Sequence, residues 1–124
     1  MTDITIDFVA RETDGSRFSM VLVEEGPWES VSVEAELRRV QSRLYGCLDA
    51  AIDGQLAEKF PESRGKPVTI RVDFYNVPEV PVREFFQRFS SGVLDAPSYR
   101  EALATTEFVR GVSFEASFER IASG

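Results

Sequence analysis

The chain has 124 residues, a hydrophobic fraction of 43% and a formal net charge of −7, with no histidine and one cysteine, Cys47. This length fits a single domain, residues 1–124, that can bury a core without disulfides. The missing histidine excludes Ser-His-Asp and Cys-His catalysis and histidine ligation of metals, and the acidic balance argues against nucleic-acid binding through a basic surface.

The first quarter of the chain predicts two strands. Residues 4–8 alternate apolar and polar side chains, which is the two-residue period of a half-buried strand. Asp14-Gly15 is typical of a turn, and residues 18–23 form a second apolar run. We therefore expect a hairpin, and a loop at residues 25–28 ends it.

A long helix is expected after this loop. Apolar residues recur at spacings of three and four from residue 37 to residue 56, and Ser32 is a suitable N-cap. Phe60-Pro61 ends the pattern, because the residue before proline is pushed out of the α region. Gly46 and Gly54 lie inside it, where each costs about 1 kcal/mol relative to Ala and often marks the close approach of another backbone.

The second half of the chain repeats this alternation of strand and helix. Residues 68–74 alternate strictly and predict a third strand. A second helix is expected to start near Pro81, and a short third helix runs through residues 99–103 until Gly111 stops it. Residues 112–118 form the fourth strand.

The element order ββαβααβ predicts an α+β fold. The strands carry apolar residues on one face that match the apolar stripes of the helices, so we expect a two-layer sandwich with the helices on one face. Helical crossovers tend to leave their flanking strands parallel, whereas the first hairpin is antiparallel. The predicted four-stranded sheet is therefore mixed.

Three segments, residues 21–28, 53–61 and 65–75, together resemble a family of small bacterial proteins described as a domain of unknown function. The similarity covers roughly residues 4–80. The resemblance implies kinship only. It assigns no activity and no functional residues to this chain.

The loop with Glu24, Glu25 and Trp28 is the first candidate site. A tryptophan near a loop, beside two acids, can anchor a contact with another protein. The alternative is that Trp28 caps the core where the chain enters the helix.

The outward face of the sheet is the second candidate site. Asp7, Arg71, Asp73, Tyr75 and Glu115 fall on that face. Paired carboxylates can hold a divalent cation or transfer protons, but the spacing matches no ligand loop, so no metal ligand is assigned. The alternative is a solvated polar face.

Asp49 and Asp53 are four residues apart on the long helix and therefore share a face. They are either part of an interaction surface with separated charge or part of a solvated helix face.

We therefore expect a small acidic, non-catalytic protein-interaction module that binds a protein partner or a second copy of itself as a homodimer. The alternative is a small-molecule or metal-ion binding domain, or a carboxylate-based enzyme. We expect no cofactor, no nucleic-acid partner and no membrane partner. The missing signal peptide and the single thiol favour the cytoplasm.

Overall fold

The computed structural model describes residues 8–121 of the chain. Its four strands form one sheet in the order β1-β2-β3-β4, in which β1 is antiparallel to β2 and the other three strands are parallel. The strands are β1 (Phe8–Arg11), β2 (Phe18–Glu25), β3 (Lys66–Tyr75) and β4 (Val109–Glu119). The predicted mixed sheet is confirmed.

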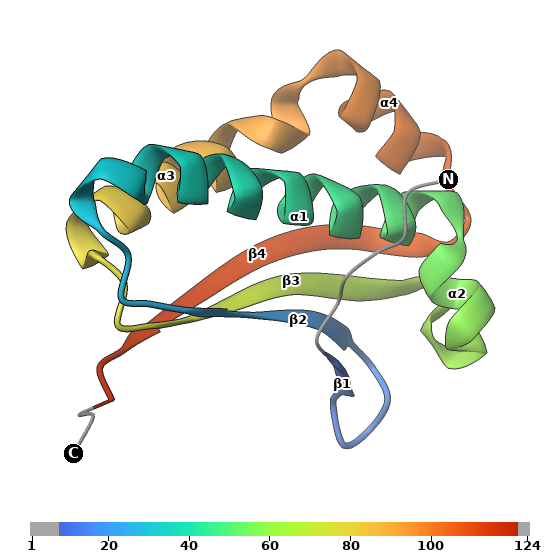
Figure 1. Cartoon of the computed structure of the whole chain (residues 1–124). Helices are drawn as coiled ribbons and strands as arrows, with labels where there is room; N and C mark the ends of the chain where they lie inside the picture. Colours follow the sequence, from blue (N-terminus) through green and yellow to red (C-terminus); the bar gives the residue numbers. More distant parts are fainter. Residues whose placement is uncertain (1–7, 122–124) are drawn as a thin grey trace.

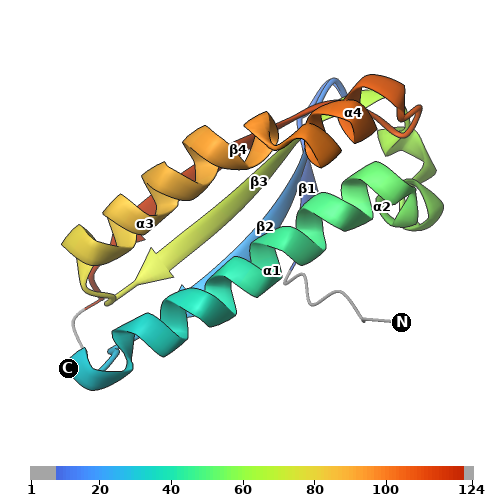
Figure 2. The ribbon, with the colours of Figure 1, turned by 90° about the horizontal axis from the view of Figure 1, so that it is seen from above.

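The helices α1, α3 and α4 lie over one face of this sheet, and the short helix α2 lies at the end of α1 (Figure 1). Seen from above, α1 forms one side of the helical layer, and α3 followed by α4 forms the other side (Figure 2). Their bounds are Val33–Asp53 for α1, Gln55–Lys59 for α2, Glu79–Gly92 for α3 and Pro97–Thr105 for α4. The expected α+β fold and element order are confirmed.

The core lies between α1 and the two central strands. Met20 and Leu22 of β2 stand in register with Ile70 and Val72 of β3, and all four side chains are buried. Because each such side chain contributes about 1.5–3 kcal/mol on burial, this block supplies much of the stability. Leu44 and Leu48 of α1 are also buried in the same core.

The predicted long helix is divided at Gly54. This residue adopts φ +100°, which ends α1 in the left-handed region before α2 begins. A Cβ built there would lie 2.9 Å from the ring of Phe108. The helix breaks because only glycine fits both this backbone and this close contact.

The ends of two strands differ from the sequence prediction. The fourth strand begins at Val109 and includes Gly111, which the sequence pattern places before it, and the register with β3 shifts there between Lys66 and Pro67. A bulge of this kind accommodates glycine within a strand. Of the expected first strand, only Phe8 is among the described residues, and Val9 pairs with Met20 on the helical side.

Candidate functional site

Glu24 lies inside the protein and not on an exposed loop. It is near the end of β2, opposite Phe74, and its side chain is 2% exposed. Two arginines of α1 surround its carboxylate: Arg39 Nη1 is 3.0 Å from one oxygen, and Arg43 Nη1 is 2.5 Å from the same oxygen. The hydrogen bonds to Glu24 hold the pKa of Arg39 above its ordinary value. This ionic cluster ties β2 to α1.

Trp28 packs against the core. Its ring meets Phe74 edge-to-face at 6.5 Å between centroids. The loop is fixed by Gly26, whose N–H donates to Tyr75 O and whose position leaves no room for a Cβ beside Asn76 O. The indole Nε1 is buried and has no hydrogen-bond partner among the described residues. Of the three candidate residues Glu24, Glu25 and Trp28, only Glu25 is exposed to solvent.

On the open face of the sheet, Arg71 neutralises the nearest carboxylates. Its Nε donates to Asp73 Oδ1 at 2.7 Å, and Glu115 stands opposite it in register on β4. Ser117 also donates to Asp73 Oδ1, at 2.8 Å. The bond to Asp73 raises the pKa of Arg71. Asp73 is buried, and its Oδ1 accepts both of these hydrogen bonds, so this arrangement is an ion pair rather than a pair of free acids.

Of the other two residues predicted for this face, Tyr75 is among the described residues and Asp7 is not. Tyr75 follows Asp73 on the same face at the end of β3 and is half-buried, in register with Glu25 and Glu119. Asp7 lies outside the described residues. Within residues 8–121, no group of three potential ligating side chains is arranged for a metal ion.

A polar pocket also opens on this face. Ser19, Thr69 and Ser113 stand side by side across β2, β3 and β4. Arg17 Nη1 donates to Thr69 Oγ1 at 3.1 Å, and the hydroxyls of Thr69 and Ser113 are 3.0 Å apart. The pocket has a volume of about 320 Å³ and carries Glu115 on its lining. It can accept small polar groups.

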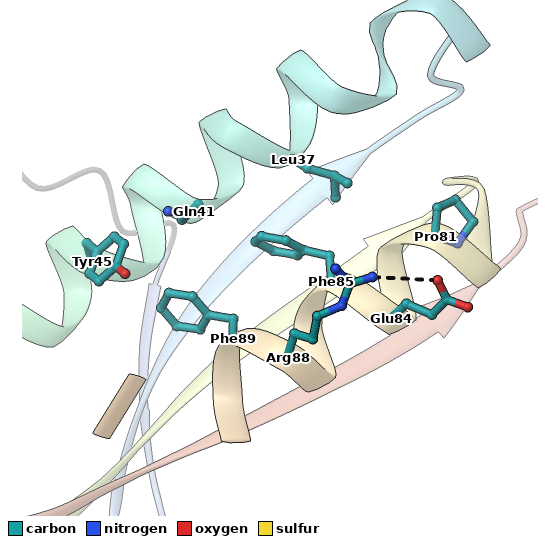
Figure 3. A pocket seen from close by; sticks show the side chains of 8 residues that line it. All are labelled: Leu37, Gln41, Tyr45, Pro81, Glu84, Phe85, Arg88 and Phe89. Atoms are coloured by element: carbon teal, nitrogen blue, oxygen red, sulfur yellow. Dashed lines mark ion pairs between the residues drawn. The ribbon is translucent and has the colours of Figure 1, made fainter. Parts of the chain in front are cut away.

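A larger pocket lies on the opposite side of the molecule, between α1 and α3. Its volume is about 450 Å³. Leu37, Gln41 and Tyr45 line it from α1, while Phe85 and Phe89 line it from α3 and point toward α1 (Figure 3). Tyr45 meets Phe89 edge-to-face at 5.2 Å. The floor is therefore aromatic and apolar, and Gln41 is exposed at its edge.

A second pocket continues along α1 toward its C-terminus. It has a volume of about 460 Å³, and Asp49, Ile52 and Asp53 line it from α1, with Tyr99 on the α4 side. Tyr99 stacks on Tyr45 at 6.1 Å and donates a hydrogen bond to Asp49 Oδ1 at 2.8 Å. Burial, followed by this hydrogen bond, raises the pKa of the Tyr99 phenol.

These two pockets share one stripe of α1. Apart from Ile52, their α1 residues are Leu37, Gln41, Tyr45, Asp49 and Asp53, each four positions after the previous one. Residues four apart are neighbours on the helix surface, and each step of four advances about 40° around the axis, so the pockets follow one another along a row that is inclined to the axis of α1. We call this combined feature the α1 groove. The sequence pattern predicts that Asp49 and Asp53 share a face, but it does not indicate the aromatic side chains of α3 and α4 that line the groove beside α1.

No helix in the described part of the chain is both long and apolar enough to cross a membrane. Comparison with protein-family models, curated proteins and solved structures finds no match to this chain. The resemblance of three segments to an uncharacterised bacterial family stays a prediction.

Proposed function

We propose that this protein is a non-catalytic interaction module that binds a protein partner in the α1 groove. The observation that supports the proposal most strongly is the groove itself: partly exposed aromatic and aliphatic side chains at one half, and two carboxylates at the other. A contact surface with an apolar centre and charged surroundings is typical of protein interfaces. The net charge of −7 favours a basic partner through long-range attraction.

The composition of the groove supports binding rather than catalysis. Asp49 accepts a hydrogen bond from Tyr99, and Asp53 accepts from the side chain of Gln55, at 2.8 Å each. No thiol lines either pocket, and the chain has no histidine. Proton transfer near neutral pH would need a group whose pKa lies near that pH.

The test is capture of partners from a native lysate with a variant that fills the groove. Gln41 and Ser98 are exposed and line its two halves from α1 and α4. The double variant Gln41→Tyr/Ser98→Tyr places bulk in the groove without changing its charge. Gln87→Tyr/Ser91→Tyr makes the same two substitutions at exposed positions of α3 that line neither half of the groove, and is the matched control.

We expect a stoichiometric partner that the unmodified protein and Gln87→Tyr/Ser91→Tyr retain and the groove variant loses. A partner retained equally by all three proteins would place the binding surface elsewhere. Light scattering on the purified protein distinguishes a different partner from a second copy of this chain.

A second candidate function is the binding of a small polar molecule in the pocket of Arg17, Thr69 and Ser113. It is supported by the aligned hydroxyls and by a guanidinium that has no ion pair within the described residues. A thermal-shift screen of polar metabolites and divalent cations tests it, because a bound ligand raises the melting temperature. A response that Arg17→Ala abolishes would support this function, and a flat screen would oppose it.

A further inference from the structure

We propose that the occupant of the α1 groove is a single amphipathic helix, with apolar side chains over the aromatic half and one or two Lys or Arg side chains at the Asp49–Asp53 half. This inference rests on the proposed function and adds the chemistry of the partner.

The groove has the length and the walls of a helix-binding site. From Leu37 to Asp53 it follows four to five turns of α1, which at 1.5 Å per residue is about 24 Å. A partner helix of about 16 residues that crosses α1 obliquely, along this inclined row, spans this distance. Amphipathic helices commonly bind in such apolar grooves between helices.

An extended peptide fits this groove less well. Its walls are α1 on one side and α3 with α4 on the other, and the interior backbone groups of these helices are bonded within the helices (Figure 2). An extended segment would therefore find few backbone partners, and its own amides would lose water. A helix satisfies its backbone internally and needs only side-chain contacts.

The aromatic half supplies the apolar contacts. Leu37, Tyr45 and Phe85 are each only partly buried, and Phe89 closes the floor between them. At the rim, Glu84 and Arg88 pair with each other at 3.9 Å and leave this half without net charge (Figure 3). Apolar side chains at positions i, i+3 or i+4, and i+7 of a partner helix match this floor.

The acidic half supplies the charge. Asp49 and Asp53 are exposed, one helical turn apart, and no basic side chain among residues 8–121 forms an ion pair with either. By contrast, Glu34, Glu79 and Glu84 each pair with an arginine four residues later. The two aspartates leave an uncompensated negative charge that favours one or two cations on the partner. Because the charge lies at one end only, it also fixes the direction of the bound helix.

Selection from a library of random 16-residue helical peptides, with the full chain as bait, tests this proposal. We expect enrichment of peptides that carry an apolar stripe and Lys or Arg at one end. Affinity for a selected peptide should fall about tenfold in Asp49→Asn/Asp53→Asn, because two exposed ion pairs of up to about 0.7 kcal/mol each are lost. Asp49→Lys/Asp53→Lys should instead prefer the same peptide with its basic residues replaced by Glu.

Each result has a distinct meaning. Selected peptides that lack basic residues, or that bind the asparagine variant equally well, would overturn the basic-helix inference. If Gln41→Tyr/Ser98→Tyr still removes their binding, the groove remains the binding surface. Selected peptides that bind Asp49→Asn/Asp53→Asn and Gln41→Tyr/Ser98→Tyr with unchanged affinity would overturn the groove as well.

Discussion

Glu24 shows how one buried carboxylate connects the two layers of the molecule. It continues the inward alternation of Phe18, Met20 and Leu22 along β2, so its side chain points at α1 rather than into solvent. Removing a buried charge from water is costly unless good partners replace the water, and Arg39 and Arg43 do so here. The cluster tolerates its burial only while all three members are present.

Glu24→Gln should therefore lower the free energy of unfolding by about 2–3 kcal/mol. Loss of one member of a fully buried pair costs about 3–5 kcal/mol, and we reduce this range because the Arg39 side chain is 45% exposed. Urea unfolding of the full chain measures the change. Glu34→Gln is the control, since its pair with Arg38 is exposed and should contribute less than about 0.5 kcal/mol. Equal losses of unfolding free energy in the two variants would show that the buried cluster contributes no more than an exposed ion pair.

Tyr99 predicts a pH dependence at high pH. Burial and the hydrogen bond to Asp49 raise its pKa in the folded protein above the unfolded value of about 10. A group with a raised folded pKa contributes stability that is complete below the unfolded pKa and is lost as the pH rises toward the folded one. The free energy of unfolding should therefore fall more steeply above about pH 10 in the unmodified protein than in Tyr99→Phe.

Denaturant unfolding at a series of alkaline pH values measures this slope, and Asp49→Asn provides the matched variant. It keeps the phenol buried but removes the carboxylate, so its slope should lie between the other two. Identical slopes in all three proteins would mean that the surroundings of Tyr99 do not shift the pKa of its phenol.

At the scale of elements, Gly46 within α1 and Gly54 at its C-terminal end should respond in opposite directions to replacement by alanine. Gly46 lies in the helix interior, where an added Cβ would meet nothing within 4 Å, whereas a Cβ at Gly54 would meet the Phe108 ring at φ +100°. Gly46→Ala should raise the free energy of unfolding by about 0.5–1 kcal/mol through helix propensity. Gly54→Ala should lower it by about 1–3 kcal/mol through backbone strain and crowding. Thermal or urea unfolding of both variants checks the signs, and stabilisation by Gly54→Ala would refute the account of the helix break.

Local patterns predict most elements, because each strand and helix places its apolar residues at its own period. The parallel pairing of β2, β3 and β4 follows from the helical crossovers between them. The break at Gly54 does not follow, since it depends on Phe108, more than fifty residues away. The strand extension through Gly111 likewise depends on its partner strand. Such contacts between distant segments leave no local pattern in the sequence.

The same division applies to the candidate site. The i, i+4 spacing of Asp49 and Asp53 places them on one helix face, and the structure brings both to one pocket. Tyr99 and the aromatic side chains of α3 complete the groove through tertiary packing, which periodicity does not report. The assignment of Glu24 to an exposed loop is wrong. Its spacing of two residues from the apolar Leu22 already indicates that it continues the inward face of β2.

For the whole molecule, stability is unevenly distributed between the two sides of the helical layer. The core residues of β2, β3 and α1 are almost completely buried, whereas α4 has no buried residue. Segments with few buried contacts open locally at lower free energy than the global unfolding. The wall of the α1 groove that carries Tyr99 is therefore the least firmly held of its sides.

Hydrogen exchange should reveal this asymmetry. In the free protein, amides of α4 (Pro97–Thr105) should exchange much faster than those of α1 near Leu44 and Leu48, whose side chains are fully buried. A helix bound in the α1 groove would contact both α1 and α4, so binding should slow exchange in α4 more than in the already protected α1. Mass spectrometry of peptic fragments, with and without a selected peptide, measures both effects. Equal protection of α4 and α1 in the free protein would contradict the expected local opening. Unchanged exchange of α4 on binding would mean that the partner reaches only the half of the groove between α1 and α3.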